Sequence, residues 1–285
     1  MERTLVIAEC GMCHDGDNAR AVRLIDAAAR AGANAAKFQF WSSSERLATR
    51  RHRPERAELY ERYRVPESWL AHLKAWCERA GIELVLSSYL PEDVWRVAEY
   101  AETLKIASPE ANDKEHLVAH VAPANAGRSV LISMGLGADH RMVDDWLMRG
   151  INDGIRQVSG RVRLLHCVSC YPAPVTQLAL HKLRCDWQTG ERYHGLSDHA
   201  PPDITMTGAI AVAAGATVVE RHLRLDDTSA ENPDFAVAMT PAEFTSYVRL
   251  IRFAEEALGE PTYSPDGSHQ PCEADRLACR VGVGI

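Results

Sequence analysis

The stretch Gly195-Leu196-Ser197-Asp198-His199 decides how we interpret the rest of the chain. In an extended strand, side chains two positions apart share a face, so Ser197 and His199 are expected to point the same way. A second strand-like run further along repeats this arrangement with Glu220 and His222. Two short strands that each end in a histidine predict one site between neighbouring strand ends. Our hypothesis is that the two histidines bind a divalent metal there; the alternative is a pair of core histidines with satisfied hydrogen bonds.

Around this stretch, apolar strand-like runs alternate with helical periodicity from end to end. Strands of this kind, when followed by helices, indicate a parallel sheet covered on both faces. Eight such units favour an α/β fold of the (β/α)8 TIM barrel type, with a doubly wound open sheet as the alternative. The predicted strands are Leu5–Cys10, Ala35–Phe40, Glu83–Ser88, Thr103–Ala107, Ser129–Ser133, Val162–Val168, Tyr193–Ser197 and Thr217–Leu223. The predicted helices are Ala19–Ala31, Pro66–Ala80, Glu92–Tyr100, Lys114–Val121, His140–Leu147, Leu178–Leu183, Ile204–Ala214 and Ala242–Leu258.

The chain is expected to form a single domain. We assign residues 1–260 to the barrel and residues 261–285 to a C-terminal extension without a domain of its own. Two helix starts carry local signals: Pro66 suits a first helical position, and Thr240-Pro241-Ala242-Glu243 predicts a capping box.

Length and charge exclude several classes of protein. At 285 residues the chain can bury a large core, and α/β barrels of this length are often single domains. The net charge of -7 argues against a nucleic-acid or anionic-membrane partner, because both reward clustered positive charge. No apolar run approaches the ~20 residues that span a bilayer. The N-terminus enters a strand without a charged-then-apolar leader, so we expect a cytoplasmic protein.

The eight cysteines are scattered along the chain. Without an export signal, reduced thiols fit better than a disulfide framework. Two C-x-x-C pairs, Cys10/Cys13 and Cys167/Cys170, allow a zinc or iron–sulfur site. Both pairs straddle predicted strand ends rather than tight turns, which argues against such a site.

Polar side chains gather at the C-terminal end of nearly every predicted strand. A TIM barrel builds its active site from the loops that follow its strands, so this one-sided distribution predicts an enzyme. The residues are Glu9, Lys37, Gln39, Ser87, Ser88, Lys105, Ser108, Ser133, Ser169, Tyr171, Ser197, Asp198, His199, Glu220 and His222.

These residue types suit a phosphorylated and carboxylated small molecule. Lys37 and Lys105 would neutralise the anion, while the serine hydroxyls would fix its orientation. Glu9 is expected to act as a general acid or base, or else to form an ion pair with one of the lysines. A metal between the histidines would polarise a carbonyl group or activate water.

One long connection, Trp41–Val65, interleaves arginines with glutamates directly after the second predicted strand. It is interpreted either as a lid whose arginines meet an anionic substrate or as a solvated helical face.

Over roughly residues 4–260 the chain resembles the N-acetylneuraminate (sialic acid) synthase family, whose members condense phosphoenolpyruvate with a sugar aldehyde. The matching motifs lie in the same order as in that family. They are Ile7-Ala8-Glu9-Cys10-Gly11 with His14 and Gly16, Lys37-Phe38-Gln39, Lys105-Ile106-Ala107-Ser108, Ser133-Met134-Gly135, His166-Cys167 with Ser169 and Tyr171-Pro172, Gly195-Leu196-Ser197-Asp198-His199, Glu220-Arg221-His222 and Pro233-Asp234.

The resemblance implies a phosphoenolpyruvate-dependent synthase that forms a 2-keto acid and phosphate, and that works as a homodimer. It implies that His199 and His222 bind the metal, usually manganese, with magnesium or cobalt as alternatives. We predict Glu9, Lys105 and His199 as catalytic residues. The predicted substrate-binding residues are Lys37, Gln39, Ser88, Ser108, Ser133, Ser169, Tyr171, Ser197 and Asp234.

The sequence also departs from the family. Members that make sialic acid carry a C-terminal domain resembling antifreeze proteins, and we expect this chain to lack it. Cys13, Met134 and Ser169 replace the residues usual in the family, which puts the acceptor in doubt. Two other functions stay open: a pyruvate-type aldolase that uses Lys105 as a Schiff base or the metal, and a non-catalytic binding subunit.

Overall fold

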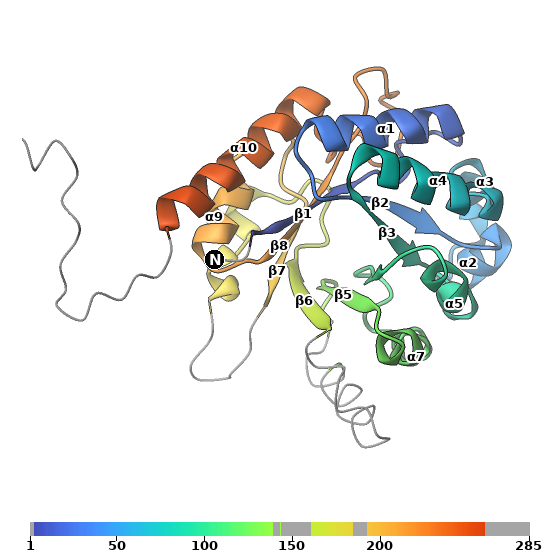
Figure 1. The fold of residues 1–285 in the computed structure, drawn as a ribbon. Coiled ribbons are helices and arrows are strands. Elements are labelled where there is room, and N and C mark those ends of the chain that lie inside the picture. Colours follow the sequence, from blue (N-terminus) through green and yellow to red (C-terminus); the bar gives the residue numbers. More distant parts are fainter. Residues whose placement is uncertain (1–2, 139–142, 144–160, 185–192, 260–285) are drawn as a thin grey trace, which may run out of the picture.

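Eight parallel strands pair in chain order, and the last pairs back to the first, so the predicted barrel is confirmed (Figure 1). The computed structural model describes residues 3–138, 143, 161–184 and 193–259. Each predicted strand is present, with ends that move by no more than two residues. The strands are β1 Leu5–Glu9, β2 Ala35–Phe40, β3 Glu83–Ser88, β4 Thr103–Ile106, β5 Ser129–Met134, β6 Val162–Cys167, β7 Gly195–Asp198 and β8 Val218–His222.

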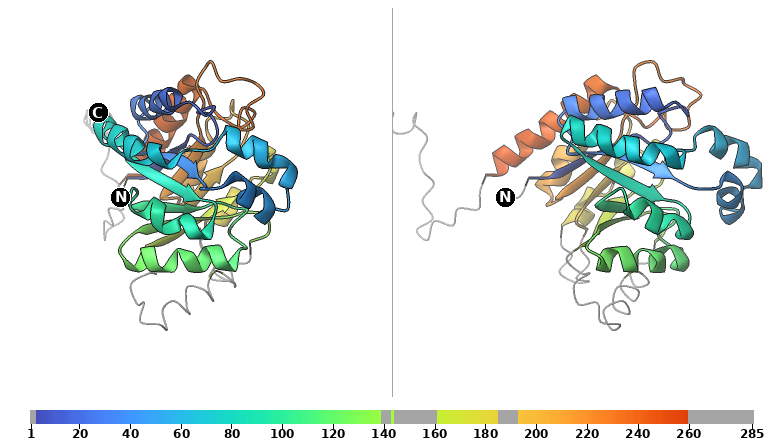
Figure 2. Two further views of the ribbon diagram at one scale, coloured as in Figure 1. Left: turned by 90° about the vertical axis from the view of Figure 1, so that its right-hand side faces the viewer. Right: turned by 45° about the vertical axis from the view of Figure 1, so that its right-hand side comes forward.

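Helices cover the outside of the barrel, and α1 packs against both α4 and α10 (Figure 2). The α-helices are α1 Asn18–Arg30, α2 Ser44–Arg50, α3 Ala57–Arg62, α4 Glu67–Ala80, α5 Val94–Ala98, α6 Lys114–Ala119, α7 Val121–Asn125, α9 Thr207–Ala213 and α10 Pro241–Leu258. The 3-10 turns are η1 Pro54–Arg56, η2 Pro91–Asp93, η3 Val175–Gln177 and η4 Leu180–Leu183.

Several predicted helices differ in detail. The predicted helix Glu92–Tyr100 is a 3-10 turn followed by the short α5, and Lys114–Val121 divides into α6 and α7. The predicted capping box is confirmed, because Thr240 Oγ1 accepts from Glu243 N at 3.3 Å while Glu243 Oε2 accepts from Thr240 N at 2.7 Å. Pro66 is the N-cap rather than the first helical residue. The predicted helix 140–147, apart from Val143, and the predicted extension 261–285 lie outside the described residues.

The inside of the barrel has an apolar layer below a polar one. Side chains that point inward from the middle of the strands form a buried cluster separate from the core between sheet and helices. Two positions further along each strand, the inward residues are polar or charged. The apolar layer therefore closes the floor of the site. Its residues are Ile7, Ala35, Val85, Leu131, Leu165 and Val218, with Leu5 packed against them.

The arginine-rich connection 41–65 contains α2, η1 and α3, which agrees with the helical alternative of its two interpretations. Ser43 caps α2 by accepting from Arg46 N at 3.3 Å. Helices α2 and α3 lie beyond the ends of β2 and β3 (Figures 1 and 2). A small core of Trp41, Leu47, Ala48, Tyr60, Tyr89 and Leu90 holds them there.

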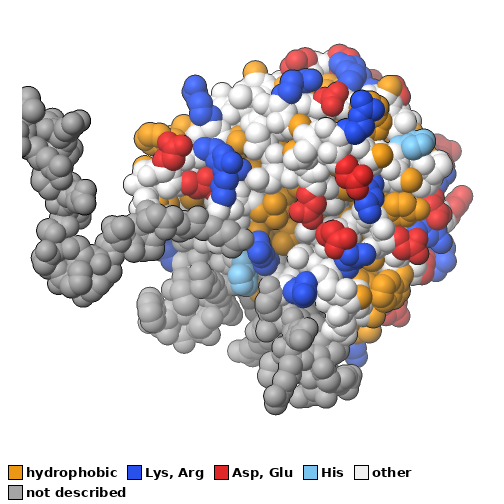
Figure 3. Space-filling view, in the orientation of Figure 1, with side chains coloured by type: hydrophobic (Ala, Val, Ile, Leu, Met, Phe, Trp, Pro, Cys, Tyr) orange, Lys and Arg blue, Asp and Glu red, His pale blue; other side chains and the backbone are white. Residues whose placement is uncertain are grey.

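The surface seen in Figure 3 mixes acidic and basic side chains over the same face. In the part of the chain that the structure describes, no helix combines the length and the apolar character that a membrane span requires.

Strands β7 and β8 approach each other closely at Gly195. A methyl group at this position would lie 2.1 Å from the Val218 carbonyl oxygen and 2.9 Å from Leu165 Cδ2. The Val218 carbonyl is backbone of a strand in the closed barrel, so it cannot move away without disturbing the ladder.

Gly195→Ala should therefore lower the free energy of unfolding by about 3 kcal/mol or more, the upper range for overpacking. Urea unfolding followed by circular dichroism measures this. Gly81→Ala is the control: its φ is 72° and no atom lies within 4 Å. It should show only the left-handed strain of about 1–2 kcal/mol. Equal losses in the two variants would contradict the steric explanation.

Candidate active site

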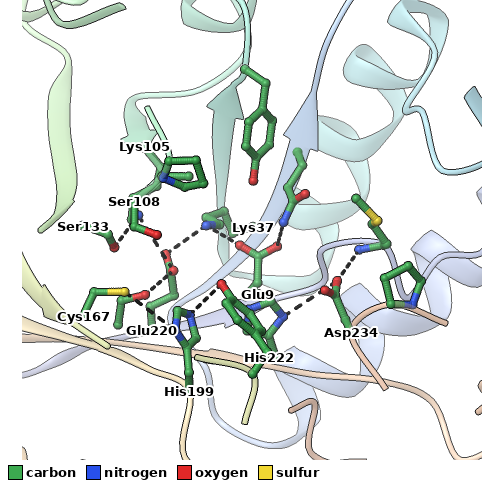
Figure 4. A pocket seen from close by; sticks show the side chains of 18 of the residues that line it. Glu9, Lys37, Lys105, Ser108, Ser133, Cys167, His199, Glu220, His222 and Asp234 are labelled. Atoms are coloured by element: carbon green, nitrogen blue, oxygen red, sulfur yellow. Dashed lines mark hydrogen bonds and ion pairs between the residues drawn. The ribbon is translucent and has the colours of Figure 1, made fainter. Parts of the chain in front are cut away.

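A cavity of about 270 Å³ opens at the C-terminal ends of the strands, where the sequence predicts the site. Most of the predicted residues line it, and Figure 4 shows their side chains converging. These lining residues are Glu9, Lys37, Gln39, Lys105, Ser108, Ser133, Tyr171, Ser197, His199, His222 and Asp234.

Two lysines and two glutamates form a buried charge network at the floor of the cavity. Lys37 Nζ makes an ion pair with Glu9 and a second with Glu220 Oε2 at 3.1 Å. Lys105 Nζ lies 3.9 Å from the other oxygen of Glu220. The side chains of Lys37 and Lys105 are only 3% and 1% exposed. Glu220 therefore bridges both ammonium groups, away from water.

Burial and the neighbouring opposite charges shift the pKa values of Lys37 and Glu220. Burial lowers the pKa of Lys37 to about 8, although Glu220 acts in the opposite direction. Burial alone would raise the pKa of Glu220, but Lys105 and then Lys37 outweigh it, so the pKa falls below the usual range. Glu220 is thus ionised at neutral pH, and Lys37 loses its charge more easily than an exposed lysine.

Hydroxyl groups extend the network along the rim. Lys105 Nζ donates to Ser133 Oγ at 2.7 Å and to the Ile106 carbonyl at 3.0 Å. Ser197 Oγ donates to Glu220 Oε1 at 3.0 Å. These contacts place two hydroxyls beside the buried charges, which suits the recognition of an oxyanion.

Ser169 lies at the edge of this arrangement. It does not line the cavity itself, but its hydroxyl donates to Ser108 Oγ at 2.9 Å, and Ser108 does line it.

Glu9 and Asp234 are both held by backbone N–H groups of the loop that follows β1. Glu9 Oε1 accepts from Gly11 N at 2.5 Å and from Gln39 Nε2 at 3.3 Å. Asp234 Oδ2 accepts from Met12 N at 2.7 Å, and burial raises the pKa of Asp234. Both carboxylates are thereby oriented before a substrate arrives.

His199 and His222 come together as predicted, with ring centroids 5.5 Å apart. His199 Nδ1 lies 2.8 Å from the Val168 carbonyl, so it carries the proton, and Nε2 accepts from the Tyr171 hydroxyl at 3.1 Å. Burial lowers the pKa of His222, which is neutral at pH 7. Its Nδ1 forms no hydrogen bond to any described residue.

This donor set offers a divalent metal two protein nitrogens, one on His222 and, once the Tyr171 hydroxyl turns away, His199 Nε2. A ring nitrogen of His222 is unused, and the backbone carbonyl at His199 Nδ1 is a usual partner for a metal-binding histidine. No group of three or more His, Cys, Asp or Glu residues within the described ranges is placed to hold a metal ion. Further ligands would therefore be water or substrate. The alternative four-cysteine site has no support in these residues, where Cys10, Cys13, Cys77, Cys167 and Cys170 are all free.

On β7 and β8, the residues that alternate with the site residues point out of the barrel and stabilise the fold. Asp198 and Arg221 are fully buried and form an ion pair at 2.9 Å outside the barrel. Asp198 also accepts from the Tyr247 hydroxyl of α10 at 2.8 Å. The alternation predicted for the two strands is thus present, with site residues inside and a structural ion pair outside.

One predicted binding residue, Ser88, points away from the cavity. Ser88 does not line the cavity. Like Leu86, two residues earlier on β3, it points out of the barrel, and its hydroxyl donates to the Leu90 carbonyl at 2.6 Å. Ser87 has the inward parity of Val85.

Sequence reasoning gave no role to three residues that line the cavity, Glu220, Cys167 and Tyr89, and named Arg51 and Arg56 only as part of the arginine-rich connection. Glu220 stood out on its strand but was given no role. Cys167 Sγ lies 3.7 Å from His199 Nδ1; burial alone would raise the pKa of this thiol, and His199 lowers it below the usual value. The arginines belong to the connection 41–65, in which the spacing alone does not distinguish them.

Comparison with known proteins decides the family, since the profile of the NeuB family matches residues 24–263. The chain belongs to the NeuB family. It is 29% identical to N,N'-diacetyllegionaminic acid synthase of Legionella pneumophila, over 94% of this chain and 77% of that protein. It is 28% identical to pseudaminic acid synthase of Campylobacter jejuni, over 91% of this chain and 76% of that protein.

Solved structures agree. The N-acetylneuraminic acid (sialic acid) synthetase of Leptospira borgpetersenii, solved in complex with citrate, superposes with a TM-score of 0.80 at 25% identity, covering 99% of this chain and 92% of that one. The resemblance to sialic acid synthases is therefore confirmed, and this NeuB-family chain is an enzyme of the sialic acid synthase type.

The free energy of unfolding measures how much the contact of Glu220 with both lysines stabilises the fold. Glu220→Gln leaves two buried ammonium groups with Glu9 as their remaining carboxylate. At pH 7 the free energy of unfolding should fall by about 3–5 kcal/mol, the usual result of removing one partner of a buried ion pair. The control is Glu102→Gln, because Glu102 pairs with Arg128 and is 71% exposed. That variant should lose no more than about 1 kcal/mol. Equal losses would show that the network is not holding the lysines.

Proposed function

We propose that this chain condenses phosphoenolpyruvate with an aldehyde-bearing sugar or sugar-like acceptor, giving a nonulosonic-acid-like 2-keto acid and phosphate. The observation that carries the proposal is the pair of buried ammonium groups, Lys37 and Lys105, at the same rim as Ser133, Ser197 and the two histidines. Membership of the NeuB family supports it, as do relatives named as legionaminic and pseudaminic acid synthases.

Phosphoenolpyruvate would bind between the lysines and the serine hydroxyls. Lys105 is already directed by Ser133 and by the Ile106 carbonyl, so it needs little reorganisation to meet an anion. The apolar layer below keeps water away from the floor, which strengthens each charge interaction.

The reaction forms one C–C bond and releases phosphate. The enol carbon of phosphoenolpyruvate attacks the aldehyde carbon, and the aldehyde oxygen becomes a hydroxyl group by taking a proton. Water then adds to the cationic carbon that bears the phosphate, and the C–O bond to phosphate breaks to leave the keto group. Glu9, which is oriented by Gly11 N and Gln39, would exchange these protons.

His199 and His222 would hold a divalent metal, for which we propose manganese. When bound, such an ion supplies Lewis-acid polarisation of the aldehyde oxygen. Tyr171, whose hydroxyl meets His199, and Asp234 would face the acceptor. A homodimeric assembly and a cytoplasmic location stay predictions.

The test of this function is phosphate release. Phosphate should appear only when phosphoenolpyruvate, manganese and an aldehydo sugar are all present, across a panel of free and phosphorylated sugars. A lysine aldolase would behave differently, since borohydride would trap Lys105 on pyruvate. Trapping without phosphate release would replace the synthase by the aldolase. No metal uptake and no turnover would favour a binding subunit.

The metal assignment has its own readout. His222→Ala should lose both bound manganese, measured by elemental analysis after gel filtration, and turnover. The control His72→Ala replaces a histidine of α4 that lies outside the cavity and should keep both. Full turnover by chelator-treated protein would contradict the assignment.

The pKa of Lys37, at about 8, predicts how affinity depends on pH. Above this value the folded protein loses the ammonium charge, so kcat/KM for phosphoenolpyruvate should fall by about tenfold per pH unit. The free energy of unfolding should change in the opposite direction. Between pH 8 and 10.5 the unfolded chain keeps the proton of Lys37, whose pKa there is near 10.5, while the folded protein loses it. The contribution of Lys37 to the free energy of unfolding therefore rises over this range. A flat kcat/KM profile to pH 9.5 would contradict the role of Lys37.

A further inference from the structure

A second cavity of about 430 Å³ adjoins the first and is lined mainly by the connection between β2 and α4. The two cavities share Arg51, Arg56, Tyr89 and Pro109. Lys37 and Lys105 line only the first, so the second has cations of its own. A molecule that reaches the histidines from this side would leave one end among arginines.

The lining of the second cavity carries excess positive charge. It contains four arginines, Arg50, Arg51, Arg53 and Arg56, against two acids, Glu110 and Asp113, which leaves an excess of two.

Two of these arginines are neutralised. Arg51 Nη2 donates to Glu110 Oε1 at 2.5 Å, and its guanidinium lies 4.5 Å from the centre of the Tyr89 ring. Arg50 binds Asp113 and, at 3.0 Å, Glu115. These ion pairs hold Arg50 and Arg51 in the wall of the cavity, so neither guanidinium is free to bind a ligand.

The other two arginines of this cavity, Arg53 and Arg56, can still bind an anion. Arg53 lies 3.8 Å from Glu55, and both side chains are about 60% exposed, so this contact is weak. Arg56 has no acidic partner within the described ranges. A guanidinium group presents a planar fork of donors that matches phosphate oxygens.

The backbone that carries these arginines is held in place before binding. The small core around Trp41 and Tyr60 fixes α2 and α3, and Asp93 accepts from Ser42 N at 2.7 Å where the connection begins. Binding therefore has to order the two arginine side chains but not the segment that carries them, which limits the entropy lost.

We propose that the second cavity binds a phosphate monoester on the acceptor, so that the acceptor is a sugar aldehyde phosphorylated at the end away from the aldehyde. An excess of two positive charges matches a dianion. This inference rests on the proposed function, whose acceptor end it identifies.

The first experiment avoids turnover. Glucitol 6-phosphate has no aldehyde, so it can be titrated calorimetrically into protein saturated with phosphoenolpyruvate, beside glucitol. It should bind at least tenfold more tightly than glucitol. The double variant Arg53→Gln/Arg56→Gln should weaken it by about 10–100-fold, the range for charge-assisted hydrogen bonds. Arg46→Gln is the matched control, because Arg46 pairs with Glu92, is 66% exposed and lines neither cavity.

The second experiment compares matched acceptors. With N-acetylhexosamines and their 6-phosphates, Arg53→Gln should raise KM for the phosphorylated sugars about tenfold and leave KM for phosphoenolpyruvate unchanged, because Arg53 lines only the second cavity. Equal use of free sugars, preference for a uronic acid, or equal effects of Arg53→Gln and Arg46→Gln would overturn the inference. If no sugar releases phosphate while the double variant still weakens glucitol 6-phosphate, the proposed function fails and the phosphate site stands.

Discussion

The site depends on two ammonium groups that stay charged although they are buried. An isolated ion costs several kcal/mol to bury, so Lys37 and Lys105 require the carboxylates that face them. Glu9 and Glu220 supply opposite charge beside these lysines, which offsets much of that cost. An entering anion unbalances that arrangement. Positive charge from a metal at the histidines would restore the balance, and this is a physical reason to expect one there.

Strand parity places this network. Along β7 and β8, alternate residues turn inward to the cavity or outward to the helices, so one short motif supplies both Ser197 with Glu220 inside and Asp198 with Arg221 outside. A slip of one residue would exchange the two sets and bury the wrong charges on each side. The ion pair outside, joined to Tyr247, therefore fixes the register that the chemistry inside needs.

Much of this was predictable from the sequence because strands buried on both faces are apolar, and because their polar ends stand out against that background. The barrel and the convergence of Lys37, Lys105 and the two histidines follow from this contrast. Ser88 was placed wrongly because two adjacent serines end β3 and only parity distinguishes them.

Other features depend on distant partners that no local pattern shows. Glu220 becomes a bridge only when β2, β4 and β8 meet around one floor. Within the connection 41–65, Arg51 differs from Arg56 because it forms an ion pair with Glu110. Glu110 comes after β3 and β4 in the sequence, so no local pattern shows this contact.

The two parts of the site are built differently. The charge network lies on strands whose positions the closed barrel fixes, so a change there disturbs fold and chemistry together. Helices α2 and α3 rest on a small core of their own, so their exposed arginines can change with little cost to the barrel. Arg51 joins the two parts, since it lines both cavities while Glu110 and Tyr89 hold it in place. Selectivity for the acceptor can therefore vary on the connection while the common chemistry stays on the strands.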